Sequence, residues 1–158
     1  MKAEQATKRL GERLLERRLV TARQLDHALM EQRKTKEFLG TVLVRLGVVQ
    51  PQALLEVLSE QYKLPHGSLR PEAVDWALVK QFPASAFSEG RCLPIHADDE
   101  TVTVAIANPL DAWALHAIER VAGLRRVQAI LVLEQELRDA MLVYHQRVLR
   151  ALTSELTP

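Results

Sequence analysis

The fold of this chain is decided by RLGERLLERRLVTARQLDHALMEQ at residues 9–32 and by FLGTVLVRLGVVQPQALLEVLSEQ at residues 38–61. The second stretch repeats the first at an offset of 29 positions. The positions that are identical in both copies are Leu10/Leu39, Gly11/Gly40, Leu14/Leu43, Val20/Val49, Leu25/Leu54, Leu29/Leu58, Glu31/Glu60 and Gln32/Gln61. A repeated sequence predicts a repeated structural unit, and here it also suggests a ligand site made of two related parts.

Each copy predicts a short helix, an interruption and a second helix. In the first copy Thr21 and Gln24 fit a capping box, in which each side chain satisfies a free backbone N–H group. In the second copy Pro51 stands at the matching start, where its missing N–H group is not needed. The leucines that follow recur at helical spacing and lead to a glutamine in both copies. Residues 1–61 are therefore expected to form an all-helical tandem-repeat subdomain.

The pattern changes in the second half of the chain. Pro65 and Gly67 mark a linker at residues 62–70, and residues 151–158 are expected to form a flexible tail. Between them, at residues 71–150, we expect helices at 71–81, from Asp111 to near Gly123 and at 134–150, and strands at 91–97, 101–106 and 127–132. The first two strands should form a hairpin. The predicted fold class is α+β, with the helical subdomain followed by a small α/β subdomain that contains a three-stranded sheet.

Composition and charge narrow the possible functions. The net charge is +1, which argues against a general nucleic-acid binder, but residues 1–38 hold ten Lys/Arg and six Asp/Glu. That excess can attract an anionic ligand, or it can be an ordinary solvated helix surface. The single cysteine, Cys92, excludes a disulfide within the chain and fits a reducing cytoplasm. No apolar run approaches ~18–20 residues, so direct insertion into a membrane is not expected, and we predict a cytoplasmic protein.

No catalytic set of residues is evident. The chain has no G-x-x-x-x-G-K-[ST] phosphate loop, no G-x-S-x-G and no H-E-x-x-H. The five histidines are scattered without the spacing of metal ligands. We therefore expect neither an enzyme, nor a metal site, nor a cofactor.

The glycines and glutamines of the repeat are the candidate binding residues. Gly11 and Gly40 lie within helical patterns, where glycine costs about 0.5–1 kcal/mol relative to alanine. Either a ligand or a second helix approaches the backbone closely at these positions. Gln32 and Gln61 continue apolar stripes, so each amide needs a polar partner, which could be a guanine edge or a helix-end carbonyl.

Together these residues form a pattern that resembles a known family. The spacing R-L-G-x-x-[LVI]-[LVI]-x-x-G-[LVI]-[LVI]-x-x-x-x-L-x-x-x-L-x-x-Q, repeated after a five-residue spacer at 33–37, is similar to that of the MshEN domain. This domain is the N-terminal region of type II secretion and type IV pilus assembly ATPases of the GspE/PilB type. Leu93-Pro94-Ile95 and the stretch VTVAIANPLD at 102–111 also resemble that family.

The resemblance implies a regulatory receptor for cyclic di-GMP that signals through a protein partner, such as a secretion or pilus ATPase or an inner-membrane assembly protein. Each copy would then contact part of the ligand through polar groups and an apolar bed. Carried over by position, the candidate site residues are Arg9, Leu10, Gly11, Leu14, Leu25, Leu29 and Gln32 in the first copy, Phe38, Leu39, Gly40, Leu43, Leu54, Leu58 and Gln61 in the second, and Asp111 in the second half.

Two positions depart from the family pattern. Arg18 replaces the internal glycine of the first copy, and an arginine costs about 1 kcal/mol there if the backbone is left-handed. Phe38 replaces the first arginine of the second copy and removes a possible charge-assisted contact. These departures, and the absence of a following motor domain, leave an alternative function. The chain would then be a protein–protein adaptor of the same fold that has lost nucleotide binding, either free-standing or excised from a larger ATPase.

Overall fold

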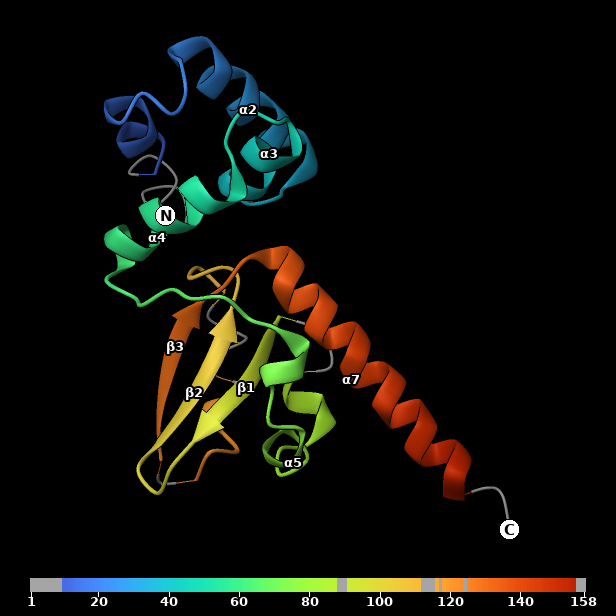
Figure 1. The fold of residues 1–158 in the computed structure, drawn as a ribbon. Coiled ribbons are helices and arrows are strands. Elements are labelled where there is room, and N and C mark those ends of the chain that lie inside the picture. Colours follow the sequence, from blue (N-terminus) through green and yellow to red (C-terminus); the bar gives the residue numbers. More distant parts are fainter. Residues whose placement is uncertain (1–9, 88–90, 112–115, 117, 124, 156–158) are drawn as a thin grey trace. The chain divides into compact units, whose positions relative to one another are not determined.

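The computed structural model describes residues 10–87, 91–111, 116, 118–123 and 125–155 (Figure 1). The chain separates into two compact units, Met1–Leu64 and Pro65–Pro158. The division falls inside the segment 62–70 that the sequence suggested as a linker. An α+β fold with helices in the first unit and a sheet in the second is confirmed.

The first unit contains the helical elements that the repeat predicted. Residues 10–16 are helical, followed by α2 (Ala22–Thr35), α3 (Leu39–Arg45) and α4 (Pro51–Tyr62). The capping box of α2 is present, because the Gln24 N–H donates to the Thr21 hydroxyl at 3.2 Å and the Thr21 N–H donates to the Gln24 amide oxygen at 2.8 Å. Pro51 begins α4.

Matching positions of the two copies occupy matching environments in the core of the first unit. Leu14 and Leu43 are both fully buried, and Leu25 and Leu54 are both 9% exposed. These leucines belong to one cluster with Leu10, Leu39, Val20 and Val49. The sequence repeat is therefore also a repeat of packing, and the two copies share a single hydrophobic core.

The glycine that both copies share lies against a leucine of the same copy. A Cβ atom on Gly11 would lie 3.1 Å from Leu25 Cδ2, and one on Gly40 would lie 2.9 Å from Leu54 Cδ2. The glycines thus let the second helix of each copy pack closely on the first. Of the two explanations that the sequence left open, close helix packing has direct structural support.

The turn after the first helix of each copy is also built in the same way. The backbones of Arg18 (φ 56°) and Gly47 (φ 68°) are both left-handed. In the first copy the Leu19 N–H donates to the Leu14 carbonyl at 2.9 Å, and in the second the Val48 N–H donates to the Leu43 carbonyl at 3.0 Å. The position therefore does require positive φ, as the family glycine suggested, and Arg18 adopts it at a steric cost.

The second unit begins with two short helical turns instead of the continuous helix predicted over 71–81. A 3-10 turn, η1 (Pro71–Ala73), is followed by α5 (Trp76–Val79). Between them Val74 is extended with ψ 127° and buried, while the Asp75 carboxylate accepts from the N–H groups of Ala77 and Leu78. The prediction of one helix was wrong because Asp75 starts a new helix and Val74 is pulled into the core. A further 3-10 turn, η2 (Ala84–Ala86), follows.

The sheet has three strands, as predicted, and their order in the sheet is β1-β2-β3. The strands β1 (Cys92–Ala97) and β2 (Thr101–Ile106) form the expected antiparallel hairpin, and β3 (Arg126–Leu131) pairs parallel to β2. The segment after the first unit runs beside β3, because the Gly67 N–H donates to the Leu131 carbonyl and the Leu131 N–H donates to the Pro65 carbonyl. Much of the predicted linker is thus held by the sheet.

The last helix, α7 (Glu134–Glu155), covers the sheet with its N-terminal half. Leu137, Ala140 and Met141 are buried there. The helix continues past residue 150, where the sequence predicted that it would end, so residues 151–155 are helical rather than a flexible tail. Its C-terminal half extends beyond the sheet near α5 (Figure 1).

The glycine–leucine contact predicts a specific energetic coupling. Gly40→Ala should gain little or lose stability in the natural chain, because its Cβ meets the Leu54 side chain. In a Leu54→Ala background the same change should stabilise by about 0.5–1 kcal/mol, since the space is then empty and alanine favours the helix. Urea unfolding of the four proteins of this double-mutant cycle measures the coupling. Additive effects would contradict the contact.

The left-handed turn gives a second prediction. Arg18→Gly should stabilise the chain by about 1 kcal/mol, because glycine carries no Cβ penalty at positive φ. Gly47→Arg is the matched change in the other copy and should destabilise by a similar amount. Thermal and urea unfolding would show both. Equal midpoints for Arg18→Gly and the natural chain would mean that the turn carries no strain.

Candidate functional site

Most of the leucines and both glycines predicted as an apolar bed lie inside the core. Leu10, Gly11, Leu14, Leu25, Leu39, Gly40, Leu43 and Leu54 are buried. Leu29 and Leu58 are only partly buried and pack at the edge of the same cluster. The buried leucines therefore support the fold beneath any ligand and offer it little exposed surface. Leu29 and Leu58 are the aliphatic candidates with exposed atoms.

Gln32 lies at the junction between the two copies. It belongs to the last turn of α2, and its amide nitrogen donates to the backbone carbonyl of Glu37 at 3.1 Å. The contact is partly buried, and it holds the residue that directly precedes Phe38. The sequence left two partners open for this amide, a guanine edge or a helix-end carbonyl. The structure gives it a backbone carbonyl, which belongs to the connector between the copies and not to a helix end.

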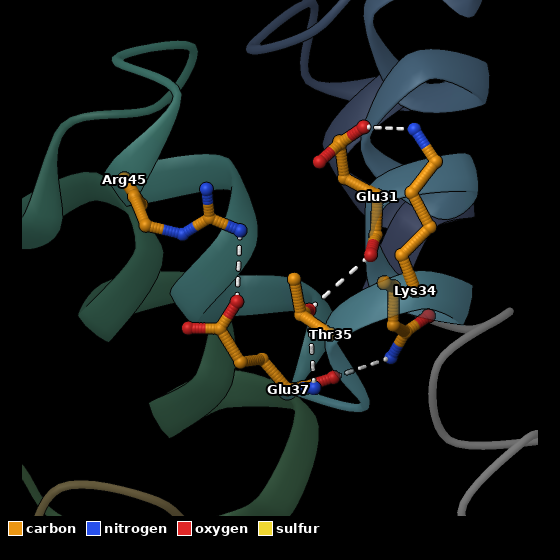
Figure 2. Close-up of polar contacts among 6 residues, drawn as sticks. Glu31, Lys34, Thr35, Glu37 and Arg45 are labelled. Atoms are coloured by element: carbon orange, nitrogen blue, oxygen red, sulfur yellow. Dashed lines mark hydrogen bonds and ion pairs between the residues drawn. The ribbon is translucent and has the colours of Figure 1, made fainter.

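The connector between the copies, residues 36–38, is further fixed by polar contacts (Figure 2). The left-handed Lys36 caps α2 through its N–H group, which donates to the Gln32 carbonyl at 2.8 Å. The Thr35 hydroxyl donates to the Glu31 carbonyl at 3.2 Å, and the Arg45 guanidinium donates to the Glu37 carboxylate at 2.8 Å. The first helix of the second copy is thus tied to the end of the first copy.

Two carboxylates of this region are stabilised in their charged form. The hydrogen bond with Thr35 and the guanidinium of Arg45 hold the pKa of Glu37 below its ordinary value. The ammonium of Lys34, 2.7 Å from the Glu31 carboxylate, holds the pKa of Glu31 below its ordinary value. At neutral pH the junction therefore carries two intact ion pairs, and an anionic ligand must compete with these carboxylates for Lys34 and Arg45.

Phe38 is an exposed aromatic residue at this junction. Its side chain is 43% exposed, and its backbone forms the N-terminal cap of α3 without a side-chain hydrogen bond. A family arginine at this position would start the second copy as Arg9 starts the first. The ring is accessible, so Phe38 offers a flat apolar face where the pattern has a cation.

An ion pair that the sequence did not reveal joins the two copies elsewhere. The guanidinium of Arg17, at the end of the first helix, contacts the carboxylate of Glu60 in α4. Glu60 and Glu31 are identical positions of the repeat, yet Glu31 binds Lys34 within its own helix. Only a three-dimensional arrangement could pair Arg17 with Glu60, because 43 positions separate them.

Three of the predicted site residues remain, namely Arg9, Gln61 and Asp111. Arg9 lies outside the described residues, and Gln61 is partly buried near the end of α4. Asp111 belongs to the second unit, where its carboxylate lies 3.6 Å from the Arg91 guanidinium. In the same unit, burial and the nearby Asp111 raise the pKa of the Cys92 thiol to about 12, so this thiol is a protonated core residue.

The described residues contain no group of three or more His, Cys, Asp or Glu that could hold a metal ion. Nor does any helix in the described part of the chain have the length and apolar character needed to cross a membrane. The groups at the junction of the copies are amide, carboxylate, guanidinium and aromatic groups. They can hold a ligand by hydrogen bonding, charge and stacking.

Comparison with known families matches the MshEN domain over residues 62–149, which is more than half of the chain. The chain belongs to the MshEN domain family. The matched part begins at the end of α4 and covers most of the second unit, whereas the tandem repeat lies before it. The resemblance that began from the repeat is thus supported by a separate part of the sequence.

Curated relatives extend the similarity into the first unit. The chain is 27% identical over 137 residues to the type IV pilus assembly ATPase PilB of Myxococcus xanthus and 30% identical over 119 residues to PilB of Thermus thermophilus. These alignments cover 87% and 74% of the chain but 24% and 13% of the two relatives. A further relative is the bacteriophage adsorption protein B of Escherichia coli, 26% identical over 138 residues.

Solved structures agree with the family. A structure of MshE with cdg has a TM-score of 0.70 and 29% identity, and it covers 82% of this chain and 94% of the MshE chain. The N-terminal domain of XpsE has a TM-score of 0.67 and 25% identity, with 87% and 92% covered. Both matches cover more of the chain than either compact unit contains, so they include residues of both.

Proposed function

We propose that this chain is a receptor for cyclic di-GMP that passes its ligand state to a protein partner. The observation that carries the proposal is the similarity to MshE, which was solved with cdg, the abbreviation of cyclic di-GMP. Membership of the MshEN domain family supports it. So does the tandem motif, because its two copies would face a ligand that is itself made of two equal halves.

The junction of the copies supplies suitable chemistry for such a ligand. Phe38 offers an exposed ring on which a guanine base can stack. Gln32 fixes the connector beneath it through the Glu37 carbonyl. Lys34 and Arg45 are cations at the same junction that can meet a phosphate if Glu31 and Glu37 release them. Arg9, Leu29, Leu58 and Gln61 complete the proposed contacts from the two copies.

The pilus ATPases among the relatives suggest the kind of partner. The chain spans only 24% and 13% of the two PilB sequences, so a motor of that type would have to lie in another part of a longer chain or in a separate protein. On this proposal the MshEN domain has a regulatory role and no enzymatic activity of its own.

A second function, that of an adaptor without nucleotide binding, is favoured by one observation. Phe38 stands where the second copy of the motif has an arginine, and its side chain is 43% exposed rather than used in the core. An exposed aromatic ring is also a common anchor in protein–protein interfaces. In this alternative the tandem repeat remains as scaffold.

Calorimetric titration of the purified chain with cyclic di-GMP tests the proposal. We expect selective binding with a Kd at or below about 1 μM, near −8 kcal/mol, and none with GTP or cyclic di-AMP. Arg9→Ala should abolish it, whereas Arg23→Ala, which removes an exposed cation of α2, should not. Absence of heat and of a thermal shift at about 100 μM ligand would support the adaptor instead.

Restoring the family arginine should strengthen binding. Phe38→Arg adds a charge-assisted contact to a phosphate or base, worth about 1.5–3 kcal/mol, which corresponds to about a tenfold to hundredfold lower Kd. Phe38→Leu is the matched control, because it removes the ring without adding charge. If Phe38→Arg and Phe38→Leu both weaken binding, the aromatic ring itself is the contact and the missing arginine is not a defect.

A further inference from the structure

The second unit contains an open groove far along the sequence from the tandem repeat. It lies between α5 and the C-terminal half of α7 and has a volume of about 500 Å³. Its apolar lining includes Trp76 and Val79 from α5, and Tyr144, Val148 and Leu152 from α7. The two walls therefore come from different elements of the fold, and the apolar groups face a shared space.

The half of α7 that lines the groove is open to solvent. Every residue from 145 to 154 is exposed, although the helix is regular to Glu155. Leu152, which lines the groove, is 53% exposed, whereas Leu142 and Leu149 are 56% and 63% exposed on other positions of the helix that do not line it. An apolar groove that remains open on a folded unit commonly marks an interaction site.

Three cations border the groove. Lys80, Arg147 and Arg150 line it, and the lining residues that the structure describes include no carboxylate. The Arg147 guanidinium lies over the Trp76 ring, 5.1 Å from its centre. Within the described part of the chain no acidic side chain forms an ion pair with any of the three. Their charge is thus available to an outside group.

We propose that this groove docks an amphipathic helix of a protein partner, with Asp or Glu residues beside its apolar face. The apolar residues of such a helix would fill the space between α5 and α7 and cover Val148 and Leu152. Its carboxylates would meet Lys80, Arg147 and Arg150. This is helix-in-groove recognition with a charged rim, in which burial gives affinity and complementary charge fixes the orientation. The proposal does not depend on nucleotide binding in the first unit.

The same features disfavour other occupants. A second copy of the chain, docked through the same face, would bring the three cations against their counterparts, and like charges repel. A membrane surface suits a convex amphipathic helix that lies flat in the interface. Here part of the apolar surface is concave and is divided between two elements. A folded helix with acidic flanks satisfies both the shape and the charge.

Three synthetic peptides test the proposal against the full chain. Each has about 18 residues, roughly 27 Å as a helix, and the same leucine stripe, while the flanking positions are Glu, Gln or Lys. Fluorescence anisotropy should rank the affinities Glu, then Gln, then Lys, with about a tenfold difference between the first and the last at low salt. Raising the salt concentration should reduce that difference.

Variants on each wall locate the binding. Arg147→Glu on α7 and Lys80→Glu on α5 should each weaken the Glu peptide about tenfold and strengthen the Lys peptide. Arg138→Glu is the matched control, because Arg138 is an exposed cation on the same helix but outside the groove. It should leave the affinity unchanged within about twofold. Circular dichroism confirms that each variant is folded.

Other outcomes overturn the proposal. If none of the three peptides binds, or if the affinity does not depend on Lys80 and Arg147, the groove is not a site for an acidic helix. If no peptide binds, but the chain sediments with phosphatidylglycerol vesicles and Arg147→Glu abolishes that sedimentation, the face is assigned to a membrane. A dimer in light scattering that Leu152→Ser dissociates would assign it to a second copy.

Discussion

The contact between a glycine of the first helix and a leucine of the second determines how each copy of the repeat is built. At Gly11 and at Gly40 a leucine methyl group occupies the space beside the missing Cβ. This contact fixes which face of α2 is turned inward. Gln32 follows Leu25 by seven positions on the same face, so it emerges where the core ends. There its amide reaches the Glu37 carbonyl and holds the start of the next copy.

The two copies share their packing but differ at their edges. The left-handed turn position holds Arg18 in one copy and Gly47 in the other, with the same backbone hydrogen bonds. Glu31 pairs within α2, whereas the equivalent Glu60 reaches across to Arg17. Buried leucines must keep their size because the core is closely packed. Surface groups are free of that constraint, and the differences between the copies at Arg18/Gly47 and Glu31/Glu60 lie among them.

The sequence predicted what local patterns and the repeat control. It predicted the helices of the first unit, their capping box and the three strands, because these depend on apolar spacing and on residues with clear local preferences. It could not choose between ligand approach and helix packing at Gly11, since both require a small residue. It also missed the break at Val74, where burial in the core decides the backbone conformation over helical spacing. The pairing of Arg17 with Glu60 required the tertiary fold.

The segment that follows the repeat is hydrogen-bonded both to β3 and to the start of α7. Directly after the first unit, Pro65 and Gly67 are hydrogen-bonded to Leu131 at the end of β3. The next residues bind the start of α7, because the Glu136 carboxylate accepts from the Ser68 hydroxyl at 2.7 Å and from the Leu69 N–H at 3.2 Å. The same carboxylate accepts from the Leu133 N–H at 3.3 Å, at the N-terminus of the helix, where negative charge is favoured. Glu136 therefore joins the segment that follows the first unit to the first turn of α7. Because α7 is one continuous helix from Glu134 to Glu155, the helix that Glu136 joins to this segment is the same helix that lines the groove.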